Sequence, residues 1–195
     1  KTIMKTKTLR EMLCILFITG AVVSCKKKEV VVTPVVQTTN LTVNFSTSES
    51  FTFFRFSDST VFTSNDSATN KWDFGIRQAT IIINSHASGP GQAGVIIQNA
   101  TYADVTTAPA SGYAYDTSAA HLAIHNFTSW ATYNQQTFSF TPIAGKTFIF
   151  KTADGQHYAK MEMLNVSYEA FVGPFPKHII YRFRYTYQPN GTNSF

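Results

Sequence analysis

The segment from Ile179 to Tyr187 alternates aromatic and polar residues with a period of two. Its two sides are Tyr181, Phe183, Tyr185 and Tyr187 against Arg182, Arg184 and Thr186. This period belongs to a β-strand, and it predicts an aromatic face in the core and an arginine face in solvent. No window of the chain shows the sustained period of an amphipathic helix. These two features together restrict the chain to a mainly β fold.

Other short runs rich in Val, Ile, Thr, Phe and Tyr are separated by clusters of Gly, Pro, Asn, Asp and Ser, as strands are by turns. The predicted strands are Leu41–Phe45, Ser50–Phe56, Trp72–Arg77, Ala79–Asn84, Gly94–Gln98, Thr147–Lys151, Tyr158–Val166 and Ile179–Tyr187. Asp154-Gly155 predicts a hairpin turn, and His86–Gly94 a glycine-rich loop. We therefore expect one all-β domain of antiparallel sheets, in which nearly all of the chain's 17 Phe and all 9 Tyr are available for an aromatic core.

The first residues have the pattern of a secretory signal peptide. Basic residues precede an apolar stretch, Met12–Val23, which is shorter than the roughly 20 residues that span a bilayer. Val22-Val23-Ser24-Cys25 resembles a lipobox, so we expect cleavage after Ser24 and a lipid on Cys25. An ordinary secreted protein cleaved nearby and an uncut membrane anchor are the alternatives. Met4 is a candidate start.

The chain is expected to divide into a signal peptide (1–24), a lipid-anchored tether (25–39) and a β domain (40–195). Glu29–Thr39 is rich in β-branched residues and has no amphipathic period, so we interpret it as tether, with a first edge strand as the alternative. The net charge of +5 comes from the segment before Asn40, because nine Lys and Arg balance nine Asp and Glu after it. A neutral domain lacks the basic field that nucleic-acid binding requires. Lys26–Lys28 are expected to lie against anionic membrane.

Cysteine usage and motifs exclude several activities. Cys14 and Cys25 are the only cysteines, so the domain has no disulfide, thiol nucleophile or cysteine-ligated metal. The sequence has no nucleophile elbow, zinc-protease motif, P-loop or dinucleotide fingerprint. Asp73 and Glu162 are isolated acids with no second carboxylate placed opposite them. We therefore do not expect an enzyme.

A set of motifs occurs in a fixed order behind the lipobox. They are Lys71–Arg77 (KWDFGIR), Gly112-Tyr113, Trp130, Thr152–Gly155 (TADG), Tyr158–Met163 (YAKMEM) and Phe183–Gly191 (FRYTYQPNG). In this order they resemble the HmuY family of haem-binding lipoproteins from the Bacteroidetes, over essentially the whole mature chain. The resemblance implies an antiparallel all-β domain likened to a right hand, with haem held by a thumb-like pair of loops. It also implies an outer-membrane lipoprotein that takes haem from host haemoproteins and passes it to a TonB-dependent receptor.

The resemblance places the haem ligands in two loops, one on each side of Trp130. Family members use one histidine from each loop, and some relatives use methionines. The first loop here contains His121 and His125, whereas the second, Ala131–Phe138, contains neither His nor Met. Histidines four residues apart share one face of a regular element. They can bind one haem iron from both sides only if the segment loops around the haem edge.

Either His121 or His125 is therefore a candidate axial ligand. Tyr133 is a candidate for the second position, because tyrosinate binds haem iron in some proteins. A haem with only one axial ligand, or one held only by apolar contacts, is a further alternative. Trp130 is predicted to form a pocket wall.

The remaining histidines and methionines have structural interpretations. We expect His86, His157 and His178 to be surface or hydrogen-bonded residues, and Met161 and Met163 to be core residues. The alternative function is a lipoprotein of the same fold that has lost haem ligation and binds a protein or glycan through its loops.

Overall fold

The computed structural model describes residues 33–45, 50–173 and 175–195. The predicted signal peptide, the lipid site Cys25 and Lys26–Lys28 lie outside these ranges. Within them, no helix has both the length and the apolar character needed to cross a bilayer.

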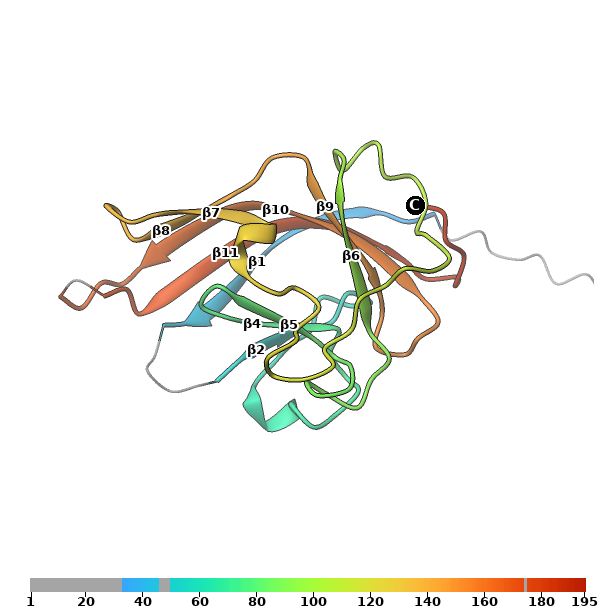
Figure 1. The fold of residues 1–195 in the computed structure, drawn as a ribbon, viewed down its shortest axis with the longest axis horizontal. Coiled ribbons are helices and arrows are strands. Elements are labelled where there is room, and N and C mark those ends of the chain that lie inside the picture. The colour runs from blue at the N-terminus through green and yellow to red at the C-terminus, as the bar shows by residue number, and fades with distance from the viewer. Residues whose placement is uncertain (1–32, 46–49, 174) are drawn as a thin grey trace, which may run out of the picture. The chain divides into compact units, whose positions relative to one another are not determined.

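Two antiparallel sheets form the domain (Figure 1). The larger has the order β1 (Val36–Asn44), β11 (His178–Gln188), β10 (Tyr158–Glu169), β9 (Lys146–Lys151) and β6 (Gly94–Asn99). The smaller has the order β3 (Val61–Phe62), β2 (Thr52–Phe54), β4 (Phe74–Arg77) and β5 (Thr80–Ile83). A separate hairpin pairs β7 (Ala131–Asn134) with β8 (Ser139–Pro142). The described residues contain no α-helix, only the short 3-10 turns η1 (Ser64–Asp66) and η2 (Phe127–Ser129). The predicted all-β antiparallel fold is confirmed.

The core lies between the inner faces of the two sheets and is built from aromatic rings. Tyr181, Phe183 and Tyr185 of β11 are fully buried. The ring of Phe54 from β2 meets Phe183 edge to face with 5.2 Å between centroids, and Tyr185 with 5.6 Å. Edge-to-face packing is favourable because the positive edge of one ring meets the negative face of the other. The alternation predicted for β11 is therefore what joins the sheets.

The outer face of β11 departs from the predicted pattern at its C-terminal end. Arg182 is exposed as expected, but Thr186 is buried. The cause is the loop that carries Tyr102, whose hydroxyl hydrogen-bonds to Thr186. The guanidinium of Arg184 lies over the Tyr102 ring, 4.5 Å from its centroid. A covering loop of this kind leaves no trace in the period of the strand.

The first strand begins earlier than the predicted domain boundary. Val36 to Thr39, which we assigned to the tether, pair with β11, from Val36 opposite Thr186 to Thr39 opposite Phe183. For these four residues the edge-strand alternative is correct. Residues 36–39 are suited to a strand by composition, and β11 extends beside them. Pairing with β11 therefore satisfies the backbone N–H and C=O groups of both strands along this stretch.

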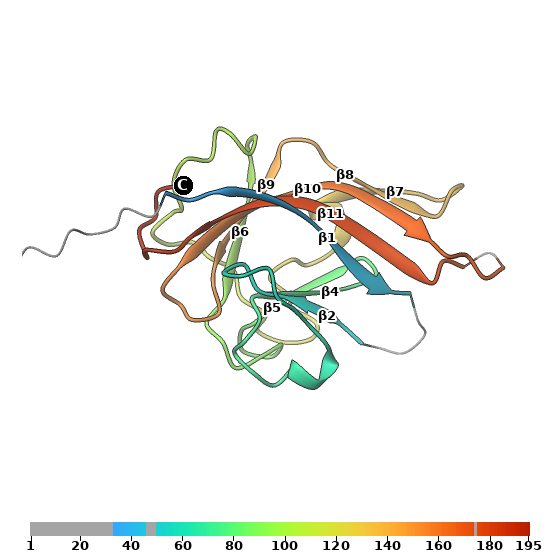
Figure 2. The same cartoon turned by 180° about the vertical axis from the view of Figure 1, so that it is seen from behind.

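The tips of two hairpins lie at the same end of the domain, away from the C-terminus (Figures 1 and 2). One is the β7–β8 hairpin, and the other is the turn between β10 and β11. The β10–β11 register shifts between Met163 and Asn165, where a β-bulge leaves Leu164 without a partner in the ladder. Such a bulge increases the local twist and bends the strand. The distal half of β10, beyond Leu164, runs alongside β8.

Candidate functional site

An apolar groove of about 580 Å³ lies at the end where the two hairpin tips meet. Three parts of the chain supply its walls: the β7–β8 hairpin, the β10–β11 turn, and a floor from Phe45 and the β4–β5 turn. The lining residues are Phe45, Gln78, Ala79, Tyr133, Thr137, Phe138, Phe140, Tyr168, Phe171, Phe175, Pro176 and Ile179. Ligand sites for small molecules have this size and this largely apolar character.

The β7–β8 hairpin forms the first wall through packed rings. Tyr133 and Phe140 lie across the hairpin with 4.8 Å between ring centroids, and Phe127 of η2 packs against Phe140 at 5.1 Å. Phe138 at the turn has a φ of +52° and is 73% exposed. A left-handed conformation is costly for a large non-glycine residue, so a turn that adopts one is held by its surroundings. The hairpin therefore presents Phe138 at the rim of the groove.

The β10–β11 turn forms the second wall and also exposes apolar side chains. Phe171, Val172 and Phe175 are 61%, 59% and 62% exposed. The Val172 N–H donates to the Phe175 carbonyl at 2.8 Å, and the Phe175 ring stacks on Phe45 with centroids 6.2 Å apart. Exposed apolar groups gathered beside a groove are typical of a binding surface, because scattered single residues are the norm elsewhere.

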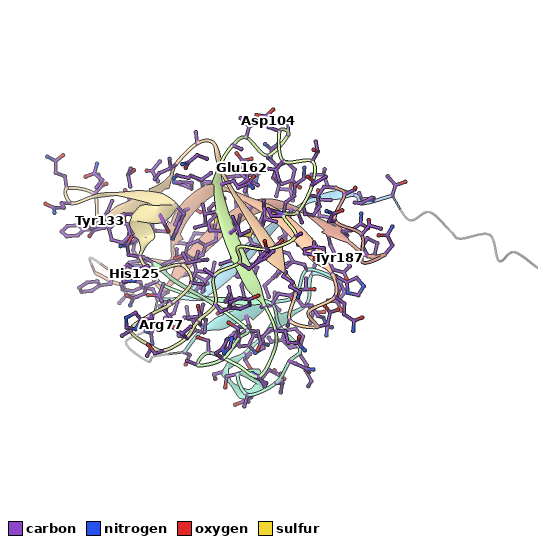
Figure 3. The ribbon with its side chains drawn as sticks, turned by 45° about the vertical axis from the view of Figure 1, so that its right-hand side comes forward. Arg77, Asp104, His125, Tyr133, Glu162 and Tyr187 are labelled. Atoms are coloured by element: carbon purple, nitrogen blue, oxygen red, sulfur yellow. The ribbon has the colours of Figure 1, made fainter. Side chains whose placement is uncertain are left out.

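Of the predicted ligand candidates, Tyr133 lines the groove and the two histidines do not. Tyr133 is 38% exposed. His125 is exposed and lies on the same side of the domain as Tyr133 (Figure 3). His121 is exposed, and its Nδ1 pairs with the Ser118 hydroxyl at 3.0 Å. The part of the first loop that contacts a groove residue is Phe127, two residues after His125, whose ring packs against Tyr133. Neither imidazole lines the groove.

Trp130 lies behind the groove wall instead of on it. It is 1% exposed and packs between Phe140 and Tyr181, with centroids 6.5 and 6.4 Å away. Its indole Nε1 is buried and has no hydrogen-bond partner among the described residues. Trp130 therefore supports the hairpin from the core side.

The other predicted residues have structural positions. Met161 and Met163 are in the core, as expected. His157 is hydrogen-bonded to Asp154, as expected. His178, expected to be a surface or hydrogen-bonded residue, is half-buried, and its buried Nδ1 has no hydrogen-bond partner in the described part of the chain. In the same ranges no three His, Cys, Asp or Glu side chains converge on a possible metal site.

Sequence reasoning missed the aromatic residues that make up most of the groove. Phe171 and Phe175 stand in a Gly- and Pro-containing turn segment, where large apolar side chains are unexpected. That mismatch between turn chemistry and hydrophobicity was the available signal. Phe45 carries no such signal, because it follows an ordinary strand.

Two solved structures resemble the domain. The apo HmuY analog of Tannerella forsythia (TFO) matches with a TM-score of 0.53 and 16% identity, over 80% of this chain and 97% of that one. Apo PinO from Porphyromonas gingivitis gives a TM-score of 0.45 and 13% identity, over 77% of this chain and 97% of that one. No protein-family model and no curated protein matches the chain. The first likeness shows that the domain has an HmuY-like fold, as the order of the sequence motifs predicted.

Proposed function

We propose that this chain is a haem-binding protein, not an enzyme, and that haem occupies the groove between the hairpin tips. The observation that carries the proposal is the lining of the groove, in which Tyr133 supplies a phenol among several aromatic side chains. A porphyrin is a flat apolar body with an iron that accepts an axial donor. A groove of about 580 Å³ with stacked aromatic residues suits such a body.

The donor set in the groove fits a tyrosine-ligated haem. Among the described lining residues, Tyr133 and Tyr168 carry the phenols, and there is no His, Met or Cys. The Tyr168 oxygen already accepts the Phe140 N–H, and burial raises the pKa of its hydroxyl, which disfavours tyrosinate there. Tyr133 has no such partner within the described chain and is the preferred donor. Haem would supply the iron centre, which a tyrosinate oxygen can bind.

The cellular role follows from the resemblance and the predicted N-terminus. We propose that a lipid on Cys25 anchors the protein to the outer membrane. Haem would come from a host haemoprotein and pass to a TonB-dependent receptor. The domain's HmuY-like fold supports this role.

Haem titration of the purified chain tests the proposal. We expect a saturable Soret band at micromolar haem, with one haem bound per chain. Tyr133→Phe should move the band and weaken binding about tenfold or more, because it removes the axial oxygen but keeps the ring. Tyr115→Phe, at a 36% exposed tyrosine outside the groove, is the matched control and should bind as the wild type does.

His121→Ala and His125→Ala test the histidine candidates in the same assay. Each should leave the Soret position unchanged if Tyr133 is the donor. A band that moves with either histidine variant and not with Tyr133→Phe would overturn the tyrosine assignment. The absence of a saturable band would overturn the haem proposal itself.

The exposed rim favours one second function, an interaction module for an apolar partner. Phe138, Phe171 and Phe175 are more exposed than a groove wall requires. A chain that binds no haem but still binds a fluorescent apolar dye, and loses that signal in Phe138→Ser, would support this second function.

A further inference from the structure

A second pocket, of about 470 Å³, lies on the loop between β5 and β6. Its lining residues are His86, Gly89, Pro90, Gly91, Gln92, Tyr115 and Lys151. It shares no lining residue with the apolar groove. Its lining mixes polar and apolar surface, whereas the lining of the apolar groove is mostly apolar, so it suits a different class of ligand.

The floor of this pocket is held by the buried amide of Asn84. Its Nδ2 donates to the carbonyls of Trp72 at 2.7 Å and Thr69 at 2.9 Å, and its Oδ1 accepts the Gly91 N–H at 2.8 Å. Asn84 is fully buried. A buried amide with its donors and acceptor satisfied fixes the backbone around it.

Glycine is required where the loop crosses Asn84. A Cβ on Gly89 would stand 2.8 Å from Cζ2 of Trp72, and one on Gly91 would stand 2.8 Å from the Asn84 carbonyl oxygen. Only a residue without a side chain permits such an approach. The loop is therefore packed onto the sheet, and the pocket above it is formed before any ligand arrives.

Four side chains around this loop can recognise a ligand: His86, Gln92, Tyr115 and Lys151. Lys151 of β9 is half-buried at the pocket, and it has no hydrogen-bond or ion-pair partner within the described residues. His86 and Tyr115 are exposed, and their rings meet edge to face with centroids 5.5 Å apart. His86 has a φ of +44°, a left-handed backbone conformation that is uncommon for a residue other than glycine.

Among the described residues, Lys151 forms no ion pair with a carboxylate. Asp116 is buried and accepts the N–H groups of Ile83 and Ala123. Asp154 is bound to His157 and Thr152 in the β9–β10 turn. The lysine charge is thus available to an incoming anion.

We propose that this pocket binds a sugar that carries a carboxylate, either a uronic acid or a sialic acid. The Lys151 ammonium would bind the carboxylate through a charge-assisted hydrogen bond. The Gln92 amide, the His86 imidazole and the loop backbone would bind hydroxyl groups, while the C–H face of the sugar packs on Tyr115. An apolar ligand would leave these polar groups without partners, which disfavours it.

An NMR titration of the full chain with D-glucuronate, N-acetylneuraminate and D-glucose tests the proposal. At least one of the two acids should saturate the protein, and which one does so distinguishes the two sources. Lys151→Met should weaken that binding about tenfold, and Lys151→Arg should retain it. Lys146→Met, at the other end of the same strand and outside the pocket, is the matched control.

Each remaining outcome overturns the proposal. The proposal is wrong if neither acid binds, or if glucose binds as well as glucuronate. It is also wrong if acetate competes as well as the sugar acids, or if Lys151→Met binds like the wild type. Haem binding in the groove is independent of all these results, because the two pockets have no residue in common.

Discussion

The backbone N–H of Phe140 donates a hydrogen bond of 2.9 Å to the hydroxyl oxygen of Tyr168. Phe140 is in the small β7–β8 hairpin, and Tyr168 is near the end of β10 in the large sheet. This bond joins two elements that share no strand pairing, and both residues line the apolar groove. The geometry of the groove therefore depends on a contact between a main chain and a side chain.

Tyr168→Phe should loosen the hairpin without unfolding the domain. The Phe140 N–H would lose its acceptor at a cost of about 0.5–1.5 kcal/mol. We expect faster amide exchange at Phe140 and weaker haem binding. Tyr158→Phe, at the opposite end of β10, is the control and should change neither quantity. Unchanged exchange at Phe140 in Tyr168→Phe would contradict the role of this bond.

Asp73 should make the domain less stable as the pH rises from about 4 to about 6. Its side chain is 4% exposed, and burial raises its pKa from 3.8 to about 6, despite hydrogen bonds from the Phe56 and Ala153 N–H groups. Between these values the folded state binds more protons than the unfolded state, so the free energy of unfolding falls with pH, by about 3 kcal/mol at most. This pH dependence is opposite in sign to that of an ion-paired aspartate, for which the free energy of unfolding rises with pH.

Urea unfolding at pH 4, 5 and 6 measures the effect as the difference between wild type and Asp73→Asn, which does not titrate. Asp58→Asn is the control, because Arg55 holds the pKa of Asp58 at about 2, below this interval. If Asp73→Asn and the wild type have the same pH slope, the prediction is wrong.

Lys160→Met should destabilise the loop that covers the outer face of β11. The Lys160 Nζ donates to the carbonyls of Tyr102 at 2.9 Å and Val105 at 2.7 Å, and it lies over the Tyr102 ring. Removal of a charged donor from two buried acceptors costs about 1–3 kcal/mol. Chemical denaturation should show this loss, with faster amide exchange between residues 100 and 108. The exposed Lys177→Met should leave both unchanged.

Gly75→Ala should destabilise the smaller sheet. A Cβ on Gly75 would stand 2.6 Å from Cδ1 of Phe53, and Phe53 is itself buried against Trp72 with centroids 4.4 Å apart. Overpacking of this kind costs about 1–3 kcal/mol. Phe53→Leu should recover part of the loss when combined with Gly75→Ala, which thermal denaturation of the four variants of the cycle measures. Additive losses would show that the two side chains do not compete for space.

The strands of the large sheet were predictable because their residues alternate or form apolar runs. Each of the eight predicted segments, in both sheets, overlaps an observed strand. The β7–β8 hairpin was not predictable, because its strands Ala131–Asn134 and Ser139–Pro142 are short and mostly polar. Contacts between β8 and β10 hold the hairpin in place. Period-based reasoning cannot detect a strand that depends on a distant partner.

The candidate site was predictable only in part, for a related reason. Residue type alone makes Tyr133 a candidate haem-iron donor. Its neighbours in the groove, Phe45 and Phe175, are far away along the chain and meet because β1 and β10 both pair with β11. His121 and His125 are candidate donors by residue type and are close in sequence, but they lie outside the groove.

The pairing of β1 also fixes how far the groove lies from the point where the chain enters the sheet. The chain enters the sheet at Val36 beside Thr186, and β1 then runs to Asn44 beside His178, next to the groove. Nine extended residues cover about 30 Å. The aromatic groove therefore lies at the far end of β1 from the point where the chain enters the sheet, beside the turn that joins β10 to β11.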